Sequence, residues 1–297
     1  MAANKCLEEK LLLLGARKGV EARSFTSFRI GGEVGFFAEP RNADELAELM
    51  SAAKCCGYPI YVIGNGTNLL VSDDGVDALF IRIGSRMSAY SFNETTVSAE
   101  AGALLCTVAK ASVAAGLGGM EWAAGIPGTI GGAVAMNAGA YGGEIKQILR
   151  RVTYVSNGRL ITKRVCGNEL SYRKSPFAWP DAIVVSAEFE LNKDDGGAAA
   201  RMEDYNIRRR TKQPLEFPSA GSTFKRPKDR YAGALIEEAG LKGKRIGGAM
   251  VSPKHAGFIV NCGGATFEDV CELMAFVQKT VFDMSGVLLE PEVKIVR

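Results

Sequence analysis

Two spacings of apolar positions run along the chain, and each predicts a type of element. Apolar residues three and four positions apart indicate amphipathic helices, whereas alternation or short β-branched runs indicate strands. Helices are expected over residues 7–14, 44–56, 104–115, 198–211, 232–239 and 267–284. Strands are expected over residues 34–38, 59–63, 78–83, 95–101, 182–191 and 287–296.

Local signals mark the ends of several of these elements. Glycine often ends a helix in the left-handed conformation, and one follows each of three expected helices: Gly15, Gly57 and Gly240. Thr266 can cap the last helix, with Asp269 at its third position. The pair Asn157-Gly158 between two apolar alternations predicts a type I′ hairpin over residues 149–164.

The order of these elements predicts an α+β protein of more than one domain. At 297 residues the chain is long enough for two or three compact domains. The mixed strand and helix pattern divides into residues 1–85, 86–196 and 197–297, with the run Asp194-Asp195-Gly196-Gly197 as a linker. In this division the final strand, 287–296, is free to return to the first part.

Two glycine-rich turns are the most informative local feature. The first, Gly64-Asn65-Gly66-Thr67-Asn68-Leu69-Leu70, follows an apolar strand pattern. The second, Gly125-Ile126-Pro127-Gly128-Thr129-Ile130-Gly131-Gly132, stands close to Asn137-Ala138-Gly139-Ala140-Tyr141-Gly142. Glycine lets backbone N–H groups converge on a ligand, so the pair predicts a site for the two ends of a phosphate-bearing cofactor. Neither the dinucleotide fingerprint nor a Walker-type loop fits the spacing.

Composition and charge narrow the class of protein. A hydrophobic content of 47% and a charged content of 23% are typical of a globular protein, and a net charge of +3 does not indicate nucleic-acid binding. The charge is uneven, because residues 201–260 hold 13 Lys or Arg against 6 Asp or Glu. This stretch is either a solvated basic face or a site for a multiply charged anion.

Cysteine and histidine usage exclude other classes. Seven cysteines without a C-x-x-C pair, and a charged start without a secretion signal, predict reduced thiols and a cytoplasmic location. A single histidine, His255, cannot build a His-rich zinc site. We therefore expect no metal, no membrane insertion and no nucleic-acid partner.

Three segments carry candidate chemistry, each with an ordinary alternative. Ser222 is followed closely by Lys225 and Arg226, so it is either a turn residue or a proton donor beside fixed positive charge. Arg173 is either a surface residue or a planar fork for a carboxylate. Glu292 would share a strand face with Glu290, either as a solvated pair or as part of a site.

These segments, in this order, resemble the UDP-N-acetylenolpyruvoylglucosamine reductases, the MurB family. The two glycine turns are similar to the flavin-phosphate loops of that family. Ser171-Tyr172-Arg173, Ala220-Gly221-Ser222 and Glu290-Pro291-Glu292-Val293 are similar to its three catalytic segments. The resemblance runs over nearly the whole chain.

The resemblance implies a vanillyl-alcohol-oxidase/PCMH-type fold, with two FAD-binding subdomains (1–85 and 86–196) and a C-terminal α+β substrate-binding domain (197–297). It implies FAD as cofactor and NADPH as co-substrate in the reduction of UDP-N-acetylglucosamine-enolpyruvate to UDP-N-acetylmuramate, a precursor of peptidoglycan. Hydride would pass from reduced FAD N5 to the substrate. Ser222 would then supply the proton, while Arg173 and Glu292 bind the carboxylate. The cofactor residues it implies are Gly64, Asn65, Gly66, Thr67, Asn68, Leu69, Leu70, Gly125, Ile126, Pro127, Gly128, Thr129, Gly131, Gly132, Asn137, Ala138, Gly139 and Tyr141.

By the same resemblance, Lys212 and Arg226 are expected to contact the diphosphate of the UDP-sugar, and His255 and Asn261 are expected to line the substrate-binding site. Arg226 stands where many members of the family carry Asn, and residues 252–261 resemble the subclass that lacks an extra tyrosine-bearing substrate loop. No histidine lies near the glycine turns, so FAD is expected to be non-covalent, and the protein is expected to be a monomer.

Two other functions remain compatible with the sequence. Another FAD oxidoreductase of this fold, such as an oxidase of sugars or hydroxy acids, would leave the basic stretch 201–260 without a role. A nucleotide-binding regulator without catalysis would not need Arg173, Ser222 and Glu292 together.

Overall fold

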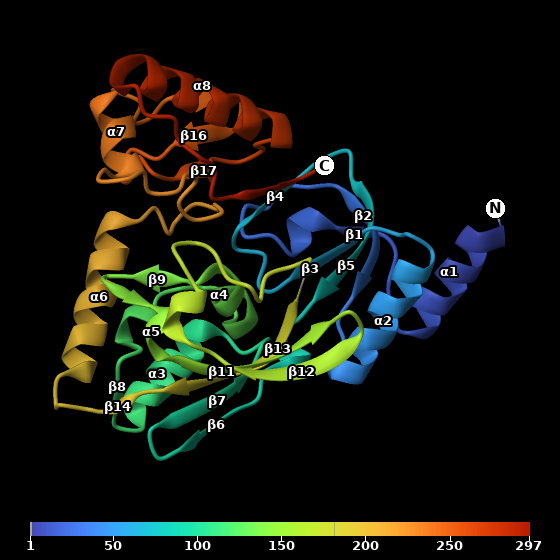
Figure 1. Ribbon diagram of the computed structural model, residues 1–297. Coiled ribbons are helices and arrows are strands. Elements are labelled where there is room, and N and C mark those ends of the chain that lie inside the picture. The colour runs from blue at the N-terminus through green and yellow to red at the C-terminus, as the bar shows by residue number, and fades with distance from the viewer. Residues whose placement is uncertain (1, 181) are drawn as a thin grey trace. The chain divides into compact units, whose positions relative to one another are not determined.

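The computed structural model describes residues 2–180 and 182–297, which form two compact units (Figure 1). The first unit comprises Met1–Lys18, Phe36–Asn65 and Ala78–Arg208, and the second comprises Gly19–Gly35, Gly66–Asp77 and Arg209–Arg297. The first glycine turn therefore begins in one unit and ends in the other. The helix α6 (Ala198–Lys212) crosses the same boundary.

A five-stranded antiparallel sheet dominates the first unit, in the order β12-β11-β13-β7-β6. The predicted hairpin is confirmed, because β11 (Leu149–Ser156) pairs with β12 (Arg159–Arg164). Asn157 and Gly158 between them both have positive φ, at 49° and 72°, as a type I′ turn requires. The other strands are β13 (Ile183–Glu190), β7 (Thr96–Glu100) and β6 (Tyr90–Asn93).

Helices and smaller strands complete the first unit around one apolar core. The helix α4 (Ile130–Met136) lies against β13 and β7 (Figure 1). β3 (Ile60–Ile63) pairs in parallel with β5 (Val76–Arg82), which enters from the second unit. The remaining elements of the first unit are α1 (Ala2–Leu13), α2 (Ala43–Cys55), η2 (Ser85–Met87), α3 (Leu105–Ala114), β8 (Leu117–Gly118), η3 (Glu121–Ala123), β9 (Gly139–Ala140), β10 (Gly143–Glu144), α5 (Ile145–Ile148), η4 (Gly167–Glu169) and β14 (Asn192–Lys193).

The second unit has its own core beneath the long helix α8 (Phe267–Ser285). The predicted cap of α8 is confirmed: Thr266 Oγ1 accepts the N–H of Asp269 at 3.1 Å, and Asp269 Oδ2 accepts the N–H of Thr266 at 3.0 Å. β18 (Lys294–Val296) pairs in parallel with β4 (Leu69–Val71). The remaining elements are β1 (Val20–Glu21), η1 (Ala22–Ser24), α7 (Ala232–Glu238), β15 (Arg245–Ile246), β16 (Ala249–Val251), β17 (Ile259–Asn261) and β2 (Glu33–Ala38), which continues into the first unit.

The sequence located the long elements but not all of the short ones. Each of the six predicted helices is present, as α1, α2, α3, α6, α7 and α8. The predicted strand over residues 287–296 is wrong for 287–293, where only Pro291 forms an isolated bridge, to Phe224. Pro291 has no N–H to give to a strand ladder, so regular pairing begins only at Lys294. The helix α4 was missed because it lies within the second glycine turn.

Among residues 2–180 and 182–297, no helix combines the length and the apolar character that crossing a bilayer requires.

Candidate functional site

The two glycine turns meet in the first unit. The Asn65 side-chain amide donates to the Pro127 carbonyl at 2.8 Å, and its Oδ1 accepts from Arg82 Nη2 at 3.3 Å. Gly64 approaches Thr129 so closely that a Cβ at position 64 would lie 2.3 Å from Thr129 Oγ1. The glycine at position 64 is therefore required by this close approach of two segments that lie far apart in the sequence.

A pocket that is partly open to solvent lies beside this junction. Four of the predicted cofactor residues line it: Gly64, Thr129, Gly131 and Gly132. The other lining residues are mostly apolar, and sequence reasoning did not single them out as site residues: Val62, Ile63, Ile83, Ala101, Ala135, Phe177, Trp179, Ala182, Ile183 and Val184. The glycine backbone and apolar walls suit a ligand with a flat ring system and phosphate groups.

Backbone hydrogen bonds fix the floor of the pocket. Gly131 N–H donates to the Ala101 carbonyl at 2.8 Å, and Ile130 N–H donates to the Ala103 carbonyl at 2.8 Å. Thr129 Oγ1 caps α4 by accepting the N–H of Gly132 at 3.3 Å. The second glycine turn is thereby tied to the end of β7 and the segment that follows it.

Asn137 ties the second turn to the segment that carries Arg173. It is buried and adopts the left-handed conformation, with φ of 43°. Its Nδ2 donates to Glu144 Oε2 at 2.9 Å and to the Ser171 carbonyl at 3.0 Å, and its Oδ1 accepts from Lys146 N at 3.0 Å. The side-chain amide of Asn137 therefore makes its hydrogen bonds within the protein, and these bonds hold the neighbouring segments at Glu144, Lys146 and Ser171 in place.

Arg173 stands in a tight turn at this location. Ser171 and Lys174 exchange two backbone hydrogen bonds, each 3.0 Å long, across Arg173. Arg173 itself has φ of 54°, and its guanidinium carbon lies 5.2 Å from the centre of the Tyr172 ring. The first unit thus brings together both glycine turns and the predicted carboxylate-binding arginine.

The second unit brings together the segments of Ser222 and Glu292. Thr223, directly after Ser222, accepts the N–H of Glu292 at 2.8 Å through its carbonyl. Lys225 N–H donates to the Glu290 carbonyl at 2.8 Å, and the Lys225 and Glu290 side chains form an ion pair at 3.1 Å. These hydrogen bonds therefore join the two segments beside both candidate residues. Thr223 follows Ser222 in the chain and accepts a hydrogen bond from Glu292 itself.

The end of the first glycine turn joins the same group in the second unit. Asn68 Nδ2 donates to the Glu292 carbonyl at 3.1 Å, and the Asn68 carbonyl accepts from Lys294 N at 3.0 Å. Leu69 and Leu70 continue as β4 beside β18. Gly66 has φ of 62°, and a Cβ there would lie 2.1 Å from the Phe25 carbonyl oxygen, so only glycine fits.

The predicted substrate residues differ in how much of their chemistry is already used. Asn261 is buried, donates to the Phe28 carbonyl and accepts from the N–H groups of Gly263 and Ala265. His255 Nδ1 accepts the N–H of Gly257 at 3.1 Å. Burial lowers the pKa of His255, and the neighbouring cations act in the same direction, so this imidazole is neutral at pH 7.

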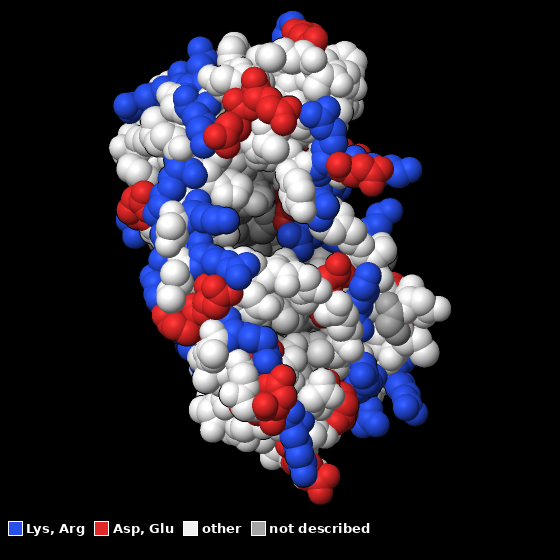
Figure 2. Space-filling view, turned by 90° about the vertical axis from the view of Figure 1, so that its left-hand side faces the viewer, with Lys and Arg blue, Asp and Glu red and all other residues white. Residues whose placement is uncertain are grey.

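The basic stretch contains several internal ion pairs. Within the second unit, Arg230 pairs with Glu238, Lys242 with Glu237, and Lys254 with Glu216. Arg226 stacks on Tyr231, with its guanidinium carbon 4.1 Å from the ring centre, and Lys212 is exposed at the end of α6. Figure 2 shows Lys and Arg side chains interspersed with Asp and Glu on the face in view.

Comparison with known families assigns the two main parts of the chain. Residues 35–162 match the FAD binding domain family. Residues 213–296 match the family described as the UDP-N-acetylenolpyruvoylglucosamine reductase, C-terminal domain.

Individual relatives agree over nearly the full length. The chain is 44% identical to the UDP-N-acetylenolpyruvoylglucosamine reductase of Agathobacter rectalis, covering 98% of this chain and 97% of the relative. It is 45% identical to the enzyme of the same description from Caldanaerobacter subterraneus, covering 91% and 90%.

Solved structures agree with these sequence matches. The crystal structure of the Thermus caldophilus reductase (MurB) is similar with a TM-score of 0.80 at 35% identity, over 95% of this chain and all of that one. Glucooligosaccharide oxidase from Acremonium strictum shares the fold only, with a TM-score of 0.50 at 15% identity over 93% of this chain and 58% of the oxidase. The chain belongs to the UDP-N-acetylenolpyruvoylglucosamine reductase family and is an FAD-binding oxidoreductase with a vanillyl-alcohol-oxidase/PCMH-type α+β fold.

Proposed function

We propose that the protein uses NADPH to reduce the enolpyruvyl group of UDP-N-acetylglucosamine-enolpyruvate, forming UDP-N-acetylmuramate. The observation that carries this proposal is the hydrogen bonding of Thr223 and Asn68 to Glu292, at 2.8 Å and 3.1 Å. It joins the segment of the proposed proton donor, the proposed carboxylate-binding residue and one proposed flavin loop within a single unit. A binding protein without catalysis has no need for this combination.

The pocket of the first unit is the proposed place for part of the FAD. Gly64, Thr129, Gly131 and Gly132 line it. The three glycines have no side chain and so leave the backbone open to a ligand. The other residues of the two turns are proposed to complete the FAD site. Bound FAD would supply the hydride-transfer chemistry of the reduction, with NADPH as the proposed source of the hydride.

The attachment of FAD is proposed to be non-covalent. The only histidine of the sequence, His255, belongs to the second unit and is held against Gly257 and Phe258. Acid precipitation should release free FAD into the supernatant. Yellow colour that stays with the precipitated protein would contradict this part of the proposal.

The residues of the chain then have distinct chemical tasks. The Ser222 hydroxyl is proposed to protonate the α carbon after hydride addition at the β carbon. Arg173 presents a planar fork that can bind the substrate carboxylate through two hydrogen bonds. Glu292 is proposed to act in its protonated form, which can donate a hydrogen bond to the same carboxylate and stabilise the enolate that develops there.

The UDP portion is proposed to bind cations of the basic stretch. Lys212 and Arg226 are the proposed diphosphate contacts, because both are exposed cations. His255 is neutral and can offer a hydrogen bond rather than charge. Asn261 uses its amide for the local fold, so we propose that it shapes the site without holding the substrate through that amide.

We also propose the role of each part of the chain, its location and its oligomeric state. Residues 1–85 and 86–196 would serve FAD, residues 197–297 would serve the substrate, and the protein would act as a monomer in the cytoplasm. Analytical ultracentrifugation of the purified protein tests the monomer directly.

Spectroscopy under anaerobic conditions tests the proposed reaction. NADPH should bleach the visible flavin absorption, and UDP-N-acetylglucosamine-enolpyruvate should restore it at a rate that supports turnover. A flavin that NADPH reduces but only oxygen re-oxidises would instead indicate an oxidase of this fold. Lack of bleaching by NADPH would contradict the proposed reductant.

A further inference from the structure

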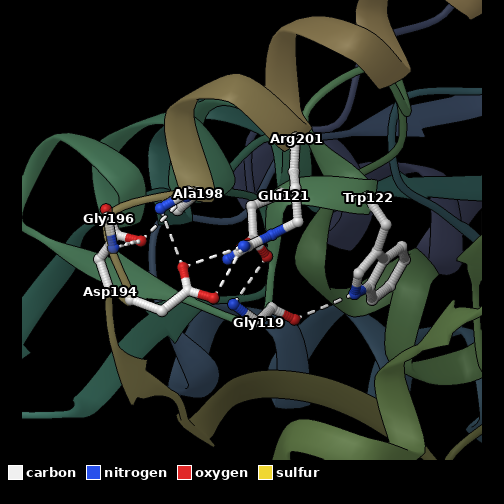
Figure 3. Close-up of polar contacts among 9 residues, drawn as sticks. Gly119, Glu121, Trp122, Asp194, Gly196, Ala198 and Arg201 are labelled. Carbon is white, nitrogen blue, oxygen red and sulfur yellow. Dashed lines mark hydrogen bonds and ion pairs between the residues drawn. The ribbon is translucent and has the colours of Figure 1, made fainter.

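An ion pair between the buried Glu121 and the half-exposed Arg201 fixes the first turns of α6 to the first unit (Figure 3). Glu121, in η3, is only 5% exposed and accepts from Arg201 Nε at 3.1 Å and Nη2 at 2.7 Å. The second Glu121 oxygen accepts the N–H of Gly119 at 2.7 Å. A buried carboxylate with three such donors is held in a single orientation.

The residues before α6 hold its start in place as well. Arg201 Nη1 lies 2.9 Å from both carboxylate oxygens of Asp195. Asp194 Oδ1 accepts the N–H groups of Gly196 at 3.0 Å and Ala198 at 2.9 Å (Figure 3). The side chains that follow Arg201 on α6 are therefore presented from a rigid base.

Tyr205, one helical turn after Arg201, stacks on Tyr141, which lies in the turn between β9 and β10 that follows the second glycine turn. The ring centres are 4.7 Å apart, and the rings are nearly parallel, at 4°. Tyr141 has φ of 53° and remains 42% exposed. A non-glycine residue in this conformation needs support from its surroundings, and the Tyr205 ring provides it.

Trp122 gives the same turn a second support. It follows Glu121 directly, and its indole N–H donates to the Gly119 carbonyl at 3.1 Å. A Cβ on Gly143 would lie 2.1 Å from Trp122 Cδ1, so the indole packs directly against the backbone after Tyr141. The α6 segment thus contacts the Tyr141 ring, and the η3 segment contacts the backbone that follows Tyr141 at Gly143.

We propose that Tyr205 is a positioning residue of the flavin site, which holds Tyr141 and its turn in the conformation that binds FAD. Glu121 and Arg201 fix the helix from which Tyr205 acts. This inference rests on the proposed location of FAD at the glycine turns. Aromatic stacking contributes about 0.5–1.5 kcal/mol, which corresponds to a change in affinity of about two- to tenfold.

The test replaces the ring and measures the release of FAD from the holoprotein on dilution, by the rise in flavin fluorescence. Tyr205→Leu should raise the dissociation constant of FAD by about two- to tenfold. Tyr205→Phe keeps the stacked ring and should bind FAD within about twofold of the parent protein. Arg208→Gln is the control on the same helix, because Arg208 is exposed and pairs with Asp204 four residues earlier on α6; it should also stay within about twofold.

Two results would overturn the inference. FAD affinity of Tyr205→Leu within twofold of the parent would show that the stack does not support the flavin site. An equal loss in Tyr205→Phe would show that the hydroxyl acts rather than the ring.

A further variant separates this inference from the proposed function. Gly132 lines the pocket, and a Cβ there would meet only Thr129 Oγ1, at 3.4 Å, so Gly132→Leu should fill the pocket and abolish FAD binding. If Gly132→Leu still binds FAD normally, the proposed location of the cofactor fails. If Gly132→Leu loses FAD and Tyr205→Leu does not, only the role of Tyr205 fails.

Discussion

The two units hold their candidate site residues by different means. In the first unit, the glycine turns can approach each other closely because Gly64 has no side chain, and no space remains for one beside Thr129. In the second unit, Ser222 and Glu292 are brought together by backbone hydrogen bonds through Thr223 and Lys225. The pocket of the first unit depends on the absence of side chains, whereas the grouping of candidate residues in the second unit depends on the pairing of distant segments.

The comparison predicts that one added methyl group disables the first unit's site. Gly64→Ala places a Cβ 2.3 Å from Thr129 Oγ1, so the two turns must separate. The expected result is a loss of FAD affinity on the order of a hundredfold, about 2.7 kcal/mol, measured by equilibrium titration with FAD. Gly84→Ala is the matched control, because the nearest atom to its Cβ would be 3.4 Å away. A Gly64→Ala protein with the affinity of that control would refute the close-approach argument.

In the second unit, the equivalent perturbation is the loss of one hydroxyl. Thr223 Oγ1 accepts the N–H of Ile259 at 3.0 Å in a buried setting, and Thr223→Val removes this acceptor without changing the shape of the side chain. The expected cost is about 1–3 kcal/mol of unfolding free energy.

Turnover should respond to the same change, while FAD binding should not. We expect kcat to fall by about tenfold in Thr223→Val, because the variant disturbs the segments that carry Ser222 and Glu292. A tenfold change in rate corresponds to about 1.4 kcal/mol of activation free energy. Thr280→Val, on an exposed part of α8, serves as the control. If turnover stays normal while stability falls, Thr223 supports only the fold.

Loss of the α8 helix cap in the second unit should lower the unfolding free energy by a smaller amount and should change neither FAD binding nor turnover. Thr266→Ala removes the oxygen that accepts Asp269 N–H at 3.1 Å. Loss of an N-cap costs about 1 kcal/mol, which denaturant unfolding can measure. Unchanged stability would mean that Asp269 and its other partners suffice to hold the end of α8.

The smallest predicted effect is a dependence of stability on pH. Backbone N–H groups of Thr266 and Gly248 lower the pKa of Asp269 below its usual value. Because the pKa is depressed in the folded state, the stabilisation is complete above the unfolded pKa of about 3.9 and is lost as the pH falls through the lower folded value. Asp269→Asn should flatten the acid side of the stability curve, measured by denaturant unfolding at a series of acidic pH values. Parallel acid curves for the parent and Asp269→Asn would contradict this assignment.

Local signals in the sequence explain which features could be predicted. The Asn157-Gly158 hairpin, the Thr266 cap and the two glycine turns each depend on residues close together in the chain, and all of these elements are present. The strand over 287–293 was overpredicted because its apolar residues resemble a strand, although Pro291 prevents regular pairing.

Other features depend on contacts that no short pattern records. Phe177 and Trp179 line the pocket without any glycine or strand signal of their own. The contact between Asn137 and the carbonyl of Ser171 joins segments 34 residues apart. The amide of Asn261 is used by the local fold, which its position in a recognisable motif did not reveal.

Transient kinetics of Ser222→Ala tests most directly whether FAD binding and catalysis depend on separate sets of contacts in this protein. Removal of the proposed proton donor should leave flavin reduction by NADPH unchanged. It should slow re-oxidation of the flavin by UDP-N-acetylglucosamine-enolpyruvate by a factor on the order of a hundred or more. Equal loss in both half-reactions, or no loss in either, would contradict the proposed role of Ser222.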